Sequence, residues 1–177
     1  MTVQEWLGEN KLSLDIWNNK YRYNEESFDE WLDRVSGNSA EVRQLIVEKK
    51  FLFGGRILAN RGITDRKLTY SNCYVLPAPQ DNIESIFETA GKLARTYSYG
   101  GGVGIDVSNL RPKGAKVHNA AKTTTGAVSF MDLYSMATGL IGQKGRRGAL
   151  MISMDVNHPD IEDFIDIKTD LDRVTKA

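Results

Sequence analysis

Between residues 72 and 168, three short apolar runs alternate with three longer segments of helical periodicity. The runs are "NCYVL" (72–76), which we predict to be buried, "VGIDV" (103–107) and "ALMISMDV" (149–156). Strands that are separated by helices cannot pair as hairpins, so they pair in parallel with the helices packed outside. This order constrains the fold more than any other feature, and it predicts an α/β chain with a largely parallel sheet.

The first helix of this region is predicted to begin at a cap formed by Asp81 or Asn82. An apolar stripe that starts with Ile83 recurs at helical spacing until three consecutive glycines, 100–102, end the pattern. One of these glycines suits the left-handed residue that closes a helix, and another suits close packing of a helix against a strand. The alternative is that bare backbone here lies directly against a ligand. The residues alone leave both interpretations open.

The other two helices are predicted from the residues at their starts. One is capped at Thr124 or Thr125 and runs to a basic glycine loop, "GQKGRRG" (142–148), which leads into the third strand. The last begins within "HPDIEDFIDIK" (158–168), where Pro159 suits the first turn of a helix.

Residues 1–53 form a separate helical region by their pattern. The segment "SFDEWLDRVSG" (27–37) begins with a serine cap, carries acidic residues in its first turn and ends at a glycine. A second helix is predicted over 42–49, after a cap at Ser39. Glycines and clustered charges indicate an ordered loop rather than a helix or strand over 54–71. We therefore predict two domains, the helical region 1–53 and an α/β region that fills the rest of the chain, 54–177.

The charge balance narrows the classes of function. The 177 residues include 23 Lys and Arg and 23 Asp and Glu, so no overall field attracts the chain to nucleic acid or to anionic membranes. No apolar run reaches the roughly 18 residues of a membrane span. Residues 1–10 lack the basic and apolar parts of a secretory signal, and we predict a cytoplasmic protein without membrane association.

The single cysteine, Cys73, cannot form a disulfide within the chain. No cluster of cysteine and histidine has the spacing of metal ligands, so we predict no metal site. Taken alone, Cys73 is best interpreted as a buried, inert residue, and His118 and His158 as hydrogen-bonding side chains.

Two basic segments are candidates for phosphate binding. "NLRPKGAKV" (109–117) places Arg111 and Lys116 on a loop stiffened by proline, which suits a phosphate receptor. Solvated surface charge is the simpler explanation of the same residues. The basic loop 142–148 could contact nucleic-acid phosphates, but the zero net charge and the lack of interleaved aromatic residues argue against this.

Five blocks of the sequence, read in order, resemble the catalytic chain of ribonucleotide reductases. They are "GGRILANRG", "SNCYVLPAPQDNIESIF", "YGGGVGIDVSNLRPKGAKVHNAAKTTTGAVSFM", "GQKGRRGALM" and "HPDIEDFIDIK". The "TYSYGGG" and "TTGAVSFMDLY" segments look most like the adenosylcobalamin-dependent class, class II. The resemblance implies that an N-terminal helical region precedes the first part of a ten-stranded α/β barrel, so that this chain holds an incomplete half-barrel.

The resemblance implies a substrate site around the "NC" block. A cysteine of that block is oxidised to a disulfide in this family while the substrate loses its 2′-hydroxyl, and Cys73 matches it. Such a thiol pair delivers two electrons and is reset by an external reductant. Ser71 and Asn72 match residues that line the substrate pocket. Gly101 and Gly102 match glycines that contact the substrate nucleotide through their backbone.

A second family site binds the deoxynucleotide effector that selects which base is reduced. Its acidic residue after the "NC" strand matches Asp81, with Asn82 and Ile83 adjoining. Arg111 matches a residue that binds the effector phosphates. A carboxylate can accept a ribose hydroxyl, and the guanidinium fork suits phosphate oxygens.

The chain departs from the family pattern in two places. Some members carry arginine where this chain has His118, and Lys116 would supply that charge instead. Gly54 and Gly55 replace the serine or threonine contacts of the first loop, so phosphate binding there would use backbone. Residues 168–177 match the loop that relays the identity of the effector to the substrate base.

These matches predict the N-terminal portion of a ribonucleotide reductase catalytic chain, inactive until a C-terminal remainder supplies the second redox cysteine and the radical-bearing cysteine. The completed enzyme would reduce ribonucleotides by thiyl-radical chemistry. The implied cofactor is adenosylcobalamin, and the implied partners are a thioredoxin-like reductant and a second copy in a dimer. Two alternatives stay open: a non-catalytic nucleotide-binding regulatory module that uses Asp81 and Arg111, and an RNA-binding protein that uses "QKGRRG".

Overall fold

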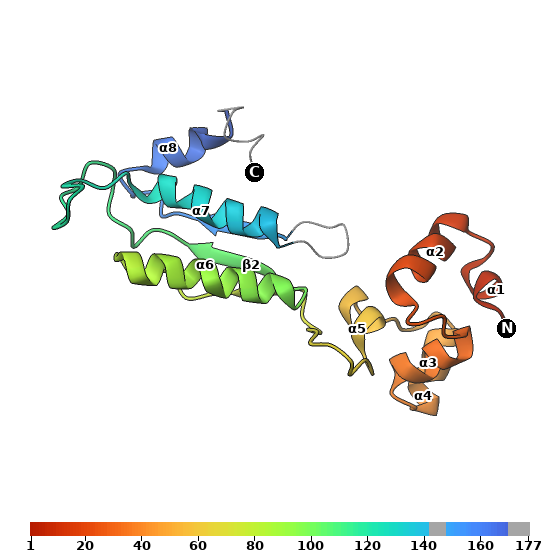
Figure 1. Ribbon diagram of the computed structural model, residues 1–177. Coiled ribbons are helices and arrows are strands. Elements are labelled where there is room, and N and C mark those ends of the chain that lie inside the picture. Colours follow the sequence, from red (N-terminus) through yellow and green to blue (C-terminus); the bar gives the residue numbers. More distant parts are fainter. Residues whose placement is uncertain (142–147, 170–177) are drawn as a thin grey trace. The chain divides into compact units, whose positions relative to one another are not determined.

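The computed structural model describes residues 1–141 and 148–169 of the chain (Figure 1). The chain divides into two compact units, Met1–Ser71 and Asn72–Ala177, and each has its own hydrophobic core. The predicted boundary after residue 53 falls within the first unit, between its fourth and fifth α-helices.

The first unit consists of short helices around a cluster of aromatic side chains. Its elements are α1 (Val3–Leu7), α2 (Lys11–Ile16), the π-helix η1 (Trp17–Tyr21), α3 (Phe28–Ser36), α4 (Ala40–Val47) and α5 (Gly55–Asn60). Trp6, Trp17, Phe28 and Trp31 are buried, and five of their ring pairs have centroids between 5.3 and 6.4 Å apart. Contacts between aromatic rings of this kind stabilise a core by about 0.5–1.5 kcal/mol per pair beyond the area they bury.

The predicted starts of two helices in this unit are confirmed. Ser27 Oγ accepts a hydrogen bond from Glu30 N, and the Glu30 carboxylate accepts one from Ser27 N, which forms a reciprocal capping box for α3. Gly37 ends α3 with a φ of 66°. Ser39 caps α4 by accepting from Val42 N. Both partners of each cap lie within three residues, which is why local sequence predicts these ends.

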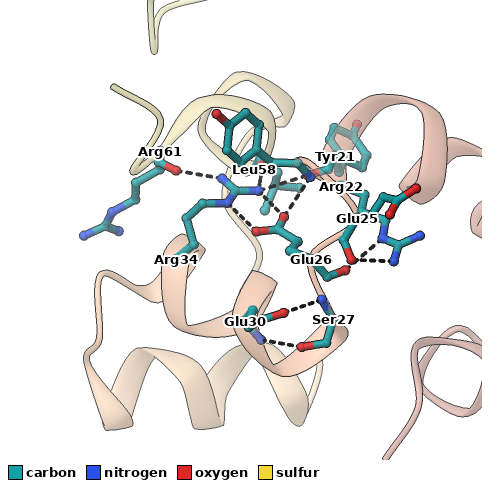
Figure 2. Close-up of polar contacts among 10 residues, drawn as sticks. Tyr21, Arg22, Glu25, Glu26, Ser27, Glu30, Arg34, Leu58 and Arg61 are labelled. Carbon is teal, nitrogen blue, oxygen red and sulfur yellow. Dashed lines mark hydrogen bonds and ion pairs between the residues drawn. The ribbon is translucent and has the colours of Figure 1, made fainter. Parts of the chain in front are cut away.

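The prediction of a loop over 54–71 is wrong at α5, which is a helix. This helix begins with glycine and has no side-chain cap, so its own sequence favours it weakly. The Arg34 guanidinium of α3 holds its C-terminal end by donating to Arg61 O at 2.6 Å and Leu58 O at 3.5 Å (Figure 2). The same guanidinium forms an ion pair with Glu26 at 2.7 Å, and both side chains are only 10% exposed. Tertiary contacts therefore determine this helix.

The second unit alternates strands and helices as predicted. Its elements are β1 (Cys73–Val75), α6 (Ile83–Ser98), β2 (Gly102–Asp106), α7 (Ala127–Leu140), β3 (Leu150–Ser153), α8 (Ile161–Asp166) and the 3₁₀ helix η2 (Ile167–Thr169). The three strands form one sheet in the order β1-β2-β3, and both pairings are parallel. The prediction of an α/β chain with a parallel sheet is confirmed.

Both crossover helices lie on one face of this sheet. The strand order advances in one direction, and right-handed crossovers then place α6 and α7 on the same side. Their shared core with the sheet includes Leu93, Val103, Ile105 and Tyr134. Figure 1 shows α6 and α7 running side by side along the strands, and Tyr134 Oη of α7 donates to the Ile86 carbonyl of α6.

The opposite face of the sheet is bare within the described part of this unit. Alternation along the strands places Cys73, Val75, Gly102, Gly104 and Met151 on that face. The side chains of Val75 and Met151 are 88% and 69% exposed. The prediction of a buried first strand is therefore wrong, because β1 is an edge strand that packs on one face only.

Three further local predictions are corrected by the structure. Ile83, the first residue of the apolar stripe, is exposed on α6. Gly126, rather than Thr124 or Thr125, is the N-cap residue of α7. Pro159 precedes α8 instead of lying in its first turn, since Asp160 is the N-cap. In the second case the missing local cap is replaced by a carboxylate that lies far away in sequence, described below.

Candidate functional site

Cys73 and Gly102 are direct neighbours on adjacent strands. The register of β1 and β2 places them opposite each other, and Gly102 N donates to Asn72 O at 2.7 Å. The thiol is free and exposed on the bare face of the sheet, so the interpretation of Cys73 as a buried residue is wrong. Ser71, also exposed, lies two residues before it. A ligand resting on Gly102 would meet the Cys73 sulfur.

The three consecutive glycines have different roles. Gly100 has a φ of 92° and closes α6, as one of the two interpretations predicts. Gly101 faces the helices, because a Cβ there would lie 2.8 Å from the Tyr74 ring. Gly102 faces the same side as Cys73. The structure therefore brings Gly102 to the thiol, whereas Gly101 could reach a ligand on that face only through its backbone.

Asp81 and Arg111, the two principal effector candidates, form a half-buried ion pair. Asp81 Oδ2 accepts from Arg111 Nε at 2.6 Å, and Asp81 Oδ1 accepts from Arg111 N at 3.2 Å. Arg111 Nη1 and Nη2 donate to Lys116 O and Asp81 O, respectively. Three of the five N–H groups of the guanidinium thus bind described residues, which leaves one donor on each terminal nitrogen for an anion.

The other effector candidates differ in their exposure and in their contacts with this ion pair. Asn82 caps α6, since its Oδ1 accepts from Ser85 N at 2.8 Å, and it is therefore occupied structurally. Ile83 is exposed at the start of α6. Lys116 and His118 are exposed and lie on the loop that follows Arg111. The structure brings Lys116 to Arg111 through its carbonyl group, whereas no hydrogen bond or ion pair links His118 to the pair among the described residues.

Sequence reasoning missed Asp106, at the carboxyl end of β2. Its Oδ2 accepts from Ser153 Oγ at 2.6 Å, which joins β2 to β3, and its Oδ1 accepts from Ser108 N at 2.9 Å. The hydrogen bond from Ser153 lowers the pKa of the Asp106 carboxyl, although partial burial opposes the shift. A polar residue within the strand pattern "VGIDV" was the available signal.

Sequence reasoning also missed Asp160, a buried residue that lies close to His158 before α8. The expectation that His158 is a hydrogen-bonding residue is confirmed, since its ring binds Leu110 O and Asp160 N. The partners of the Asp160 carboxylate lie 33 and 47 residues away. No local pattern could have identified them.

Some predictions concern residues that the structure does not describe, and others concern metal binding and membrane association. Arg146, Arg147 and most of "QKGRRG", and residues 170–177 of the predicted relay loop, lie outside the described residues. Over 1–141 and 148–169, no group of three His, Cys, Asp or Glu side chains is placed to hold a metal ion. In the same ranges, no helix has both the length and the apolar character needed to span a membrane.

A parallel sheet with helices packed on one face fits a segment of an α/β barrel. A sequence model of the ribonucleotide reductase barrel domain matches residues 71–176. The chain belongs to the ribonucleotide reductase family, and the resemblance is confirmed.

The similar proteins are much longer than this chain. A vitamin B12-dependent ribonucleoside-diphosphate reductase of Mycobacterium tuberculosis is 42% identical over 127 residues, which cover 71% of this chain and 18% of that protein. One from Thermoplasma acidophilum is 38% identical over 149 residues, 80% of this chain and 19% of that protein. The chain thus spans less than a fifth of these relatives.

A solved structure also shares the fold over most of the chain. The class Id ribonucleotide reductase alpha subunit of Actinobacillus ureae superposes with a TM-score of 0.78, at 23% identity, over 96% of this chain and 32% of that subunit. At this identity the likeness concerns the fold alone. It extends over the helical unit as well as the α/β unit.

Proposed function

We propose that this chain supplies the helical region and the opening part of the ten-stranded barrel of a ribonucleotide reductase catalytic chain, with the domain boundary near residue 53. The observation that carries the proposal is the exposed thiol of Cys73 beside Gly102 on the bare face of a parallel sheet. In a closed barrel that face would line the interior, where a nucleotide could lie on the glycine backbone.

In the proposed reaction, Cys73 is one of two reducing thiols. The carbon–oxygen bond at C2′ of the ribonucleotide breaks, a carbon–hydrogen bond forms, and the hydroxyl leaves as water. The two thiols together provide two electrons and two protons and become a disulfide. The sequence contains one cysteine, so the second thiol must come from another segment or chain, and a thioredoxin-like dithiol would reset the pair.

Asp81 and Arg111 are proposed to form part of the effector site, with Lys116 and His118 adding charge and Asn82 and Ile83 bordering it. The carboxylate would accept a ribose hydroxyl of a deoxynucleotide, and the two remaining guanidinium donors would bind its phosphates. Support comes from the 2.6 Å contact, which brings residues 30 positions apart into one site. The site would serve allosteric choice of substrate.

The proposed cofactor is adenosylcobalamin, which would supply the radical. Its support is the similarity to relatives that are named vitamin B12-dependent. The residues that bind this cofactor are proposed to lie in the C-terminal remainder of the catalytic chain. We further propose a cytoplasmic, dimeric enzyme that makes precursors for DNA replication and contacts no nucleic acid directly.

Complementation tests the proposal. The chain is mixed with a C-terminal ribonucleotide reductase segment that begins after its last residue, and deoxyribonucleotide formation is measured with a dithiol reductant and adenosylcobalamin. We expect turnover from the mixture and none from either part. Cys73→Ser should abolish multiple turnover while nucleotide binding persists, and Lys92→Gln, on the exposed side of α6, should leave turnover unchanged.

Other outcomes separate the alternatives. Full turnover by Cys73→Ser would contradict the role of the thiol. Deoxynucleotide binding without any reduction would favour the regulatory module. Salt-sensitive RNA binding that is lost when Arg146 and Arg147 are changed would favour the RNA-binding protein.

A further inference from the structure

Three distant segments of the second unit meet at the carboxylate of Asp160. Lys113 N donates to both oxygens of Asp160 at 3.1 Å, and Ala127 N donates to Oδ2 at 3.2 Å. Asp160 is 7% exposed, and no ion pair joins it to a cationic side chain in the described ranges. Its negative charge is therefore satisfied by two backbone N–H groups, which lie on either side of the base of one loop.

That loop, residues 113–126, is a hairpin that we call the finger. Gly114 N donates to Thr124 O, Thr124 N donates to Ala115 O, and Val117 N donates to Lys122 O, each at 2.9 Å. In Figure 1 it projects past the ends of α6 and α7. Asp160 joins the first residue of the finger to the residue that follows its last, so the carboxylate clamps the base of the hairpin.

His158 adds a second anchor on the other side of Arg111. His158 Nδ1 accepts from Asp160 N at 3.0 Å, so the opposite nitrogen, Nε2, carries the proton and donates to Leu110 O at 2.7 Å. The side chain is 7% exposed. Arg111 therefore lies between two anchored backbone positions, Leu110 and Lys113.

The packing at the centre of the clamp leaves no space for a side chain at Gly126. Gly126 has a φ of 93°, and a Cβ there would lie 2.7 Å from Asp160 Oδ2 and 2.8 Å from Lys113 N. The carboxylate also lies at the N-terminus of α7, which has no side-chain cap of its own, and the helix dipole favours negative charge there. One group thus fixes the start of α7 and both ends of the finger.

We propose that Asp160 and His158 are positioning residues of the effector site, which hold the backbone of Arg111 and the finger so that the guanidinium meets Asp81 and a deoxynucleotide phosphate. The inference rests on the proposed function, because it assigns residues that support the effector site without being part of it. Neither residue touches the nucleotide. They act through Leu110, Lys113 and the base of the finger.

Asp160→Asn in the full chain tests the clamp, with Asp163→Asn as the matched control. Asp163 lies three residues later, is exposed, and approaches Lys113 Nζ at 4.0 Å. Amide hydrogen exchange is followed at Gly114, Val117 and Thr124. We expect Asp160→Asn to lower protection there about tenfold while Ile105 of β2 keeps its protection, and Asp163→Asn to change neither.

The second readout is the dissociation constant for dATP and dTTP, measured by calorimetry on the chain together with its C-terminal remainder. We expect about a tenfold increase for Asp160→Asn and a smaller one for His158→Asn, with Asp163→Asn unchanged. In a double-mutant cycle, Asp160→Asn should add little once Arg111 is changed to alanine.

The outcomes distinguish this inference from the proposed function. Unchanged finger protection in Asp160→Asn overturns the clamp, and lost protection with unchanged affinity overturns the positioning role. If the wild-type assembly binds neither nucleotide, the effector site itself fails and the positioning role fails with it, whatever exchange shows. Loss of protection throughout β2 as well would overturn a local role in favour of a general structural one.

Discussion

At the scale of single residues, the Ser153 hydroxyl lowers the pKa of the Asp106 carboxyl. Ser153 Oγ and Ser108 N both donate to it, and Ser108 Oγ in turn accepts from Asp155 N at 2.7 Å. These bonds connect the carboxyl ends of β2 and β3 to the start of the segment that carries Arg111. Hydrogen bonds to the charged form of a carboxylate lower its pKa.

Ser153→Ala should therefore raise the pKa of Asp106 from its lowered value toward the ordinary value of about 3.9. Because the folded-state pKa lies below the unfolded one, this group stabilises the fold above the unfolded pKa, and the contribution disappears as the pH falls through the folded pKa. The stability difference between wild type and variant should thus shrink below about pH 4.

A carbon-13 NMR titration of the Asp106 carboxyl, with denaturation curves at several pH values, measures both effects. Ser98→Ala serves as the control, since within the described ranges Ser98 Oγ donates only to Arg95 O at the end of α6. An Asp106 titration that is identical in wild type and Ser153→Ala would contradict the prediction.

At the scale of elements, the first unit depends on one buried guanidinium. Arg34 links α3 to α5 and to the end of η1, where it donates to Tyr21 O at 3.0 Å (Figure 2). Removing one partner of a buried ion pair leaves an uncompensated charge and unsatisfied acceptors. The helix α5 exists because of these contacts, which explains why its sequence alone indicated a loop.

Arg34→Leu should destabilise the fold by about 3–5 kcal/mol, because Glu26 and three backbone carbonyls lose their donor. Arg43→Leu is the matched control: Arg43 binds Asp29 and Asp33 on the surface, and such pairs contribute about 0–1 kcal/mol. Urea denaturation followed by tryptophan fluorescence measures both. Equal effects of the two substitutions would show that the buried network has no special role.

At the scale of the whole molecule, the bare sheet face of the second unit exposes apolar side chains that no described element covers. Val75 and Met151 expose apolar side chains on it, and β1 and β3 are both edge strands in the described sheet. Exposed apolar faces and free strand edges favour association with other chains. Closure by further barrel strands would cover this surface in the proposed enzyme.

The isolated chain should accordingly self-associate, and Val75→Lys should weaken that association by about fivefold, or about 1 kcal/mol. Val156→Lys is the control, because Val156 is similarly exposed but lies after β3, outside the strands. Sedimentation velocity over a range of concentrations measures the effect. An equal reduction by both variants would indicate a general influence of charge instead of a role for the sheet face.

The candidate site could be predicted only to the extent that its residues carry local or family signals. The glycines, Cys73, Asp81 and Arg111 stand in blocks that resemble a known family, and the comparisons confirm that family. Asp160 carries no such signal, because its role depends on its hydrogen bonds with Lys113 N and Ala127 N, which are distant in sequence. The strand pattern also did not specify which face of the sheet Cys73 occupies. A one-residue change in strand register would have turned Cys73 to the packed face.

The sequence by itself determined the α/β order, the capped ends of α3 and α4, and the family, because these depend on neighbours within a few residues or on whole blocks of residues. Only the tertiary structure decided that α5 is a helix, that one face of the sheet stays bare with Cys73 on it, and that Asp160 clamps the finger. Each of these follows from contacts between segments tens of residues apart, and such contacts exist only once the chain has folded.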